Sequence, residues 1–174
     1  MSDLTLSLTT VQATYPMNRW LFKTRIVSLV VLATFCIYDL IDSGAGYFRY
    51  FTQWGLLLSN IYFIASIIFP THPKLKILFQ IAWTNEGLIT VIFWFILVPL
   101  YICYPDAVSN LKEDLLAIID RIAAHLLPMV TLTLELSLSN WTLGKIDFVY
   151  SYIFMFTYCM TDGFLVMSGK KEAY

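Results

Sequence analysis

A threonine and a histidine in two different apolar segments are the side chains of this sequence with the clearest capacity for chemistry. Thr52 lies in the aromatic block Tyr50 to Trp54, and His125 lies in the apolar segment 115–138. A threonine hydroxyl becomes a usable nucleophile when a neighbouring base takes its proton, and imidazole can do this near neutral pH. Each residue also has a structural interpretation, in which Thr52 bonds its own helix backbone and His125 bridges two helices. Catalysis requires the two side chains to meet.

The segment 115–138 carries polar side chains at positions where a membrane-spanning helix normally has apolar ones, and such polar groups are candidates for function. On a helix, Arg121, His125 and Glu135 fall on one stripe, because residues three and four apart share a face. We expect this stripe to face protein rather than lipid. Four charged residues complete the candidate site as accessory polar groups: Arg49, Glu86, Arg121 and Glu135.

The composition predicts a polytopic membrane protein with an all-α helical bundle. Of the 174 residues, 59% are hydrophobic, 17% are aromatic and 13% are charged. A soluble domain of this size would need about a quarter of its residues charged to cover itself with water-compatible surface. The net charge of −1 gives no basic field, so nucleic-acid binding is excluded as a function class.

We expect one transmembrane domain over 20–167, between an N-terminal extramembrane segment 1–19 and a C-terminal tail 168–174. The apolar runs have helix-spanning length and lack the ten-residue alternation of a membrane β-barrel, so they predict about five transmembrane helices. The predicted spans cover about 20–41, 47–69, 75–103, 115–138 and 146–167. Three basic residues at the start of the first span are interpreted as anchors at the membrane surface: Arg19, Lys23 and Arg25.

The sequence predicts neither a cofactor nor a metal site. Cys36, Cys103 and Cys159 lie in three different apolar runs, without the spacing of a metal clip or redox motif, and are interpreted as reduced. The first 16 residues carry one charge, Asp3, so they lack the basic start of a signal peptide and the arginines of a mitochondrial presequence. Localisation in the endomembrane system or in the mitochondrial inner membrane remains an open choice.

Two stretches of the chain resemble a known family. The block Tyr50 to Trp54 with the following run Leu56 to Phe63, and His125 followed ten residues later by Glu135, are similar to the androgen-induced and rolling-stone-like membrane proteins. The resemblance covers about 47–138. Characterised members are transmembrane threonine hydrolases that cleave fatty acid esters of hydroxy fatty acids. The resemblance therefore implies that Thr52 is a nucleophile and that His125 is its base.

Two features of the chain differ from what that resemblance implies. Family members usually have six spans, whereas five are predicted here. Counted from the predicted helix starts, Thr52 lies about five residues deep and His125 about ten, which is an offset of about 7 Å at 1.5 Å per residue. Helix tilt could close this offset, because both helices enter from the same side.

The alternative to a lipid-ester hydrolase is a non-catalytic accessory subunit of a larger membrane complex. In that case the expected partners are membrane lipids and other membrane subunits, which would dock on the fifth span and the N-terminal segment. Intramembrane charges such as Glu86 and Arg121 would then form ion pairs, because an unpaired charge in hydrocarbon costs several kcal/mol.

Overall fold

The fold is described from a computed structural model, which describes residues 18–44, 47, 50–103, 115–139, 141 and 148–167. For residues 43, 100, 101, 115–121 and 162–167 it describes the backbone alone. The predicted terminal segments 1–19 and 168–174 therefore lie outside this description, except for the last two residues of the first. Arg49 also lies outside it, and so does the side chain of Arg121.

All five predicted spans are helical, and the described residues contain no strand. The helices are α1 (Arg19–Ser43), α2 (Phe51–Ile68), α3 (Leu75–Ile92), the π-helical segment η2 (Phe93–Leu97), α4 (Val98–Cys103), α5 (Leu115–Ser139) and α6 (Phe148–Met167). Because α3, η2 and α4 follow one another without a break, they form one rod in the place of the third predicted span. The predicted all-α helical bundle is confirmed.

Local sequence signals explain where these helices begin and end. Asn18 caps α1, since its side-chain oxygen accepts a hydrogen bond of 3.0 Å from the backbone N–H of Trp20. Gly44 ends α1 with a φ of 53°, a left-handed conformation that glycine adopts at little cost. Tyr50 precedes α2 in an extended conformation. The second span therefore starts at residue 51, four residues later than the sequence predicts.

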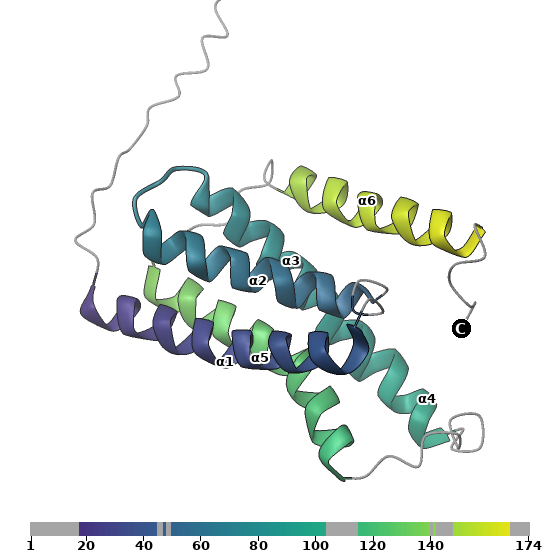
Figure 1. The fold of residues 1–174 in the computed structure, drawn as a ribbon. Coiled ribbons are helices and arrows are strands. Elements are labelled where there is room, and N and C mark those ends of the chain that lie inside the picture. Colours follow the sequence, from purple (N-terminus) through teal and green to yellow (C-terminus); the bar gives the residue numbers. More distant parts are fainter. Residues whose placement is uncertain are drawn as a thin grey trace, which may run out of the picture.

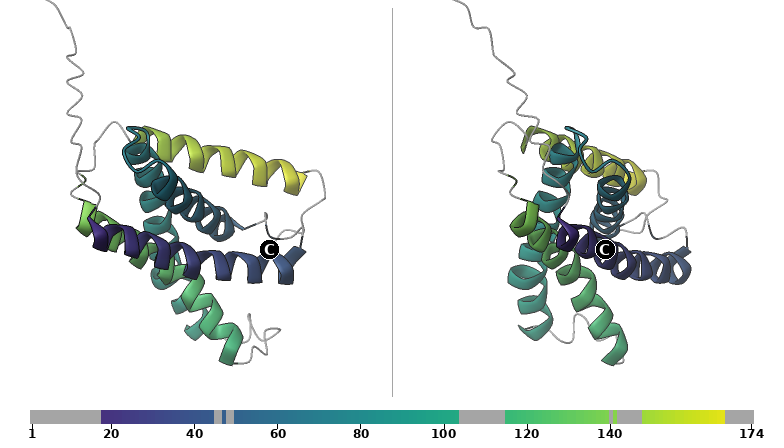
Figure 2. Two further views of the ribbon diagram at one scale, coloured as in Figure 1. Left: turned by 60° about the vertical axis from the view of Figure 1, so that its left-hand side comes forward. Right: turned by 90° about the vertical axis from the view of Figure 1, so that its left-hand side faces the viewer.

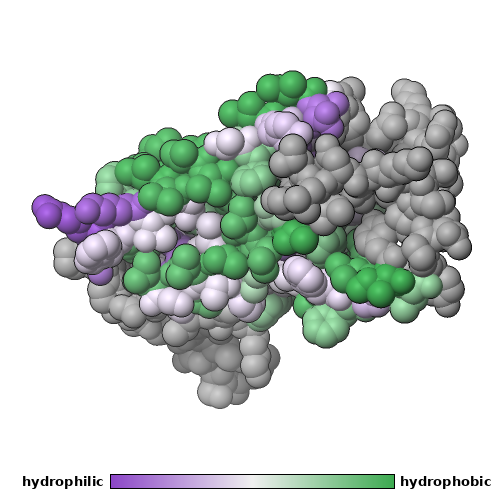
Figure 3. All heavy atoms as spheres, turned by 90° about the horizontal axis from the view of Figure 1, so that it is seen from below, coloured by the Kyte–Doolittle hydropathy of each residue, from purple (hydrophilic) through white to green (hydrophobic). Residues whose placement is uncertain are grey.

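Four helices are long and apolar enough to cross a membrane, which identifies a multi-pass integral membrane protein. They cover Arg19–Asp42, Phe51–Ile68, Leu75–Leu97 and Ile122–Ser139. The apolar part Phe148–Thr161 of α6 is shorter. Hydrophobic atoms cover most of the described surface in Figure 3, and strongly hydrophilic atoms are confined to small areas, the larger at the left-hand end. Such a surface suits lipid rather than water.

The rod that begins with α3 lies at the centre of the bundle, because α3 packs against α2, α5 and α6. Helix α1 packs against α2 and α5. In Figures 1 and 2, α1 and α6 lie on opposite sides of α2. The largest apolar side chains of the core are fully buried where α1, α2, α3 and α5 meet: Leu32, Leu56, Tyr62, Phe63, Phe79 and Leu132.

Candidate functional site

A buried ion pair joins three helices at one end of the bundle. The Glu135 carboxylate on α5 accepts hydrogen bonds from Nε and Nη2 of Arg25 on α1, at 3.0 and 2.7 Å. The hydroxyl of Tyr62 on α2 donates to the same carboxylate oxygen at 2.6 Å. Arg25 Nη1 donates to the backbone carbonyl of Ser66 at 2.9 Å. Arg25, Tyr62, Ser66 and Glu135 are called the ion-pair cluster below.

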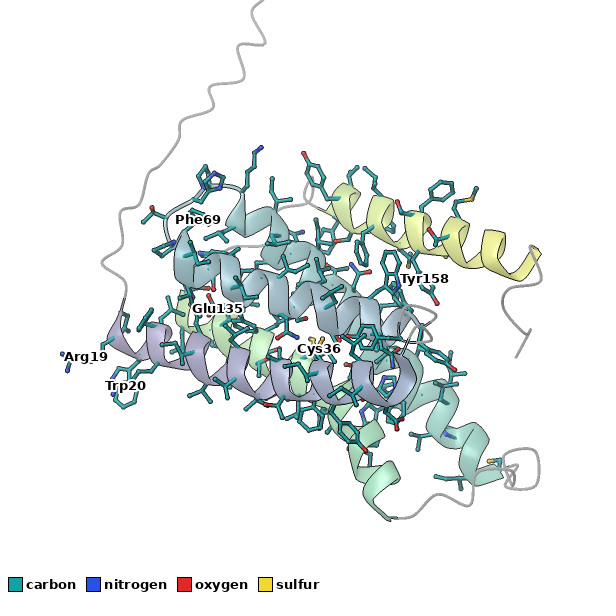
Figure 4. The ribbon with its side chains drawn as sticks, viewed as in Figure 1. Arg19, Trp20, Cys36, Phe69, Glu135 and Tyr158 are labelled. Carbon is teal, nitrogen blue, oxygen red and sulfur yellow. The ribbon has the colours of Figure 1, made fainter. Side chains whose placement is uncertain are left out.

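The ion-pair cluster is almost completely excluded from solvent, since Arg25 is 2% exposed and Glu135 is 0% exposed. Figure 4 shows Glu135 in the interior between α1 and α2, while Arg19 and Trp20 point outward at the start of α1. The prediction that Glu135 faces protein is confirmed. The interpretation of Arg25 as a surface anchor is wrong, because its position six residues after the start of α1 carries it inside the bundle.

A second buried carboxyl group, Glu86 on α3, lies where α2 and α3 approach closely. A Cβ added to Gly55 of α2 would lie 2.8 Å from Glu86 Oε1 and 2.6 Å from Ile89 Cδ1, so any larger residue would force these side-chain ends to shift. Ser59 donates a hydrogen bond of 3.2 Å to Glu86 Oε1. Glu86 Oε2 is buried and has no hydrogen-bond partner among the described residues. Among the described residues, Glu86 accepts its hydrogen bond from Ser59 and has no ion-pair partner.

His125 is half-buried and is held against the central rod by two contacts. Its ring stacks on the ring of Phe93, with centroids 4.0 Å apart and planes inclined by 14°. Its backbone carbonyl accepts a hydrogen bond of 2.8 Å from the Thr90 hydroxyl. Phe93 is the first residue of η2, and single π-helical turns inside α-helices occur frequently at functional sites.

Thr52 is the second residue of α2 and is half-buried. Within the described part of the chain, no hydrogen bond joins its hydroxyl to His125. The backbone N–H groups in the first turn of a helix have no partner inside that helix, so they lie near the Thr52 hydroxyl as potential donors.

Thr52 and His125 are equally spaced in sequence from the ion-pair cluster. Helices α2 and α5 both run from the right to the left of Figure 1, with α5 rising from below, and the Tyr62–Glu135 hydrogen bond joins them. Thr52 comes ten residues before Tyr62, and His125 comes ten residues before Glu135. Both residues therefore lie about 15 Å along their helices from that contact.

The contact between α2 and α3 relates the start of α2 to the central rod. Gly55 approaches Ile89, and Thr52 lies three residues before Gly55 on the same face of α2. Because α2 and α3 run in opposite directions, the start of α2 lies toward the same side of the bundle as the end of α3. The expected offset of about 7 Å between Thr52 and His125 was counted from the predicted helix starts and stays a prediction.

A buried tyrosine holds the connection between α1 and α2 against the start of α2. Tyr47 is 1% exposed, its hydroxyl lies 3.1 Å from the Cys36 sulfur, and it donates to the Gln53 carbonyl at 3.3 Å. Figure 4 shows Cys36 directed from α1 toward α2. Burial raises the pKa of the Tyr47 phenol, and the contact with Cys36 raises it further, so Tyr47 stays neutral and acts as a hydrogen-bonding group. The residue adjoining Thr52 is thereby fixed.

The remaining sequence predictions concern metals, cysteines and relatives. No group of three or more His, Cys, Asp or Glu side chains in the described ranges could hold a metal ion. Cys36, Cys103 and Cys159 are all free, which agrees with their interpretation as reduced residues. Comparison of the chain with protein-family models, with curated proteins and with solved structures found no match.

Proposed function

We propose that this protein is a membrane-embedded hydrolase of lipid esters, in which Thr52 is the nucleophile and His125 is the general base. The observation that carries the proposal is that Thr52 and His125 each lie ten residues before a member of the Tyr62–Glu135 contact, on two packed helices that run from right to left in Figure 1. The family resemblance of the blocks around these residues supports it. Fatty acid esters of hydroxy fatty acids are the substrate class that this resemblance favours.

In the proposed reaction, Thr52 Oγ attacks the ester carbonyl while His125 accepts the hydroxyl proton. The tetrahedral intermediate collapses by breaking the bond to the alcohol oxygen, which takes the proton from His125 and leaves as the hydroxy acid. A water molecule then attacks the acyl-Thr52 ester, and His125 takes one of its protons. Collapse of the second intermediate releases the fatty acid, and the proton returns to Thr52.

The position of Thr52 at the start of α2 supplies a source of charge stabilisation for this reaction. The free N–H groups of the first helical turn carry a partial positive charge and can donate hydrogen bonds to a developing oxyanion. Arg49 precedes this turn in the sequence and is proposed to contribute a positive charge. Phe93 holds the His125 ring in place by stacking on it. A substrate that enters between α2 and α5 would then reach both Thr52 and His125.

The test is labelling of the purified protein in nanodiscs with a fluorophosphonate probe bearing an acyl chain. Thr52→Ala and His125→Ala should each lower the labelling rate by at least about 100-fold, as removal of a nucleophile or its base does. The same two variants should abolish release of fatty acid from an ester of a hydroxy fatty acid.

Two matched control variants keep this test specific. Thr34→Ala removes an exposed hydroxyl that donates to its own helix at Val30, and His72→Ala removes the loop histidine that accepts from the Lys74 N–H. Both should label like the wild-type protein. Equal labelling of Thr52→Ala and wild type would overturn the hydrolase and favour the accessory subunit, which predicts that mild detergent extracts a complex larger than the 20.1 kDa chain in its micelle.

A further inference from the structure

A cavity of about 260 Å³ lies between α3 and α6, apart from Thr52, His125 and the ion-pair cluster. Helix α6 packs against α3 on the side of the bundle away from α1 (Figures 1 and 2). The lining comes from the middle of α3 and the first two turns of α6: Thr84, Asn85, Leu88, Phe148, Ser151, Tyr152 and Met155.

Two hydroxyl groups in this lining lack partners. The hydroxyl oxygens of Thr84 and Ser151 are buried and have no hydrogen-bond partner among the residues that the structure describes. The Ser151 side chain is 4% exposed, so lipid or water at the protein surface does not satisfy it. A buried hydroxyl without a partner costs about 1–3 kcal/mol, and native proteins rarely leave two of them at one place.

Several exposed hydroxyls on these helices bond their own backbone, and the buried Ser59 and half-buried Thr90 donate to Glu86 and to the His125 carbonyl on neighbouring helices. Thr34, Ser137, Thr157 and Thr161 each donate to the carbonyl four residues earlier, at 2.8–2.9 Å. Serine and threonine hydroxyls in membrane helices commonly make their hydrogen bond in this way. Thr84 and Ser151 make no such bond to their own backbone, and both line the same cavity. This indicates that their hydroxyls donate to a molecule bound in the cavity.

The chemistry of the lining defines the occupant. Among the residues that the structure describes, no charged side chain lines the cavity, which favours a neutral occupant. Two hydroxyls that can donate suit a group that accepts, such as an ester carbonyl. The walls formed by Leu88, Phe148 and Met155 are apolar and suit an acyl chain. The volume exceeds that of one water molecule several-fold, and the apolar walls offer few partners to a cluster of waters.

We infer that the cavity between α3 and α6 binds a neutral glycerolipid, with an ester carbonyl accepting hydrogen bonds from Thr84 and Ser151. The acyl chain lies along Leu88, Phe148 and Met155. This site is separate from the proposed reaction at Thr52, and it holds lipid whether or not the protein is a hydrolase. Asn85 turns its amide nitrogen to the Ile81 carbonyl at 2.7 Å, so its donor serves α3 rather than the ligand.

The experiment is photocrosslinking with a diacylglycerol that carries a diazirine close to its ester, in nanodiscs of phosphatidylcholine. Mass spectrometry of the crosslinked protein should place most of the label on Leu88, Phe148 and Met155. Unlabelled diacylglycerol should compete for this labelling, whereas the excess phosphatidylcholine of the disc should not. Loss of one hydrogen bond should weaken binding about fivefold, so Thr84→Val with Ser151→Ala should lower the labelling by about tenfold or more.

The control is Thr157→Val with Thr161→Val, which removes two exposed hydroxyls of α6 that serve their own backbone. It should label like the wild-type protein. Leu88→Trp fills the cavity without removing a hydroxyl and should also abolish the labelling, which tests the site independently of the double variant. Wild-type labelling of the Thr84→Val, Ser151→Ala variant, or an even spread of label over exposed residues of α6, would overturn the site, as would equal crosslinking by photoreactive phosphatidylcholine.

Discussion

The ion-pair cluster and the region around Thr52 and His125 use the same helices and differ in the contacts that hold their side chains. At Glu135, one carboxylate oxygen receives three hydrogen bonds from two side chains, while its second oxygen is buried without a partner among the described residues. About 15 Å along the same helices, an aromatic stack on Phe93 holds His125. Several charge-assisted hydrogen bonds tie three helices together at the first region, which therefore has a structural role. The second region is where the proposed hydrolysis would take place.

Glu135→Leu tests the structural side of this comparison and should have the largest effect. It leaves the Arg25 guanidinium buried without its carboxylate, and breaking a buried pair in this way costs about 3–5 kcal/mol. We expect a large loss of thermal stability in detergent, measured by unfolding-dependent fluorescence. Adding Arg25→Leu should restore much of the loss, because two apolar residues replace the pair. A fully stable Glu135→Leu protein would contradict a structural role for the cluster.

Tyr62→Phe removes one donor from the Glu135 carboxylate and leaves the ion pair in place. A hydrogen bond to a charged group contributes about 1.5–3 kcal/mol, so the destabilisation should be smaller than that of Glu135→Leu. The labelling of Thr52 by the fluorophosphonate should persist in the folded fraction of this variant. A variant that is stable but unlabelled would show that the two regions are not separate.

Gly55→Ala tests the close approach of α2 and α3 beside Thr52. Its new methyl group would lie 2.6 Å from Ile89 Cδ1 and 2.8 Å from Glu86 Oε1, so the ends of these two buried side chains must shift, at a cost toward the lower end of about 1–3 kcal/mol. Gly87→Ala is the matched control, because its nearest neighbour would be Met129 Cε at an ordinary 3.8 Å. We expect the control to be neutral or slightly stabilising in the same unfolding measurement.

Glu86→Gln should have the smallest effect and distinguishes the buried carboxyl groups of Glu86 and Glu135 most directly. Glu86 has a serine as its described partner, and a glutamine oxygen can accept the same hydrogen bond from Ser59. The change in unfolding free energy should stay within about 1 kcal/mol. Glu135→Gln removes the charge opposite Arg25 and should cost clearly more. If Glu86→Gln and Glu135→Gln changed the free energy of unfolding equally, the ion pair with Arg25 would not be what makes Glu135 important for stability.

Much of the fold could be predicted from the sequence, because apolar runs of bilayer length allow hardly any other structure than helices. The main boundary error is at α2, which was expected to begin at 47. Tyr47 is instead buried in its own contact with Cys36, so the chain continues past it before the helix starts. Contacts of this kind depend on residues brought together by folding, and no local pattern signals them.

The candidate site could be predicted in part. The helical stripe correctly predicted that Glu135 faces the interior, because the spacing of residues within one helix is a local property. Its partner Arg25 is 110 residues away in the sequence and resembles a surface anchor, since basic residues are common at the start of membrane helices. Its depth within α1 and the presence of carboxylates inside other apolar segments were the available signals. The unpartnered hydroxyls of Thr84 and Ser151 could not be foreseen, because only packing shows which hydroxyls leave their own backbone.

The π-helical turn Phe93–Leu97 has a consequence for how the length of this chain can change. A π turn holds about one residue more than an α turn, so the rod could lose one residue there and close into a regular α-helix. A deletion within α3 would instead rotate every later residue by about 100° and turn Phe93 away from His125. We therefore expect single-residue insertions and deletions among homologous sequences to gather at this turn, where they leave the register of α3 unchanged.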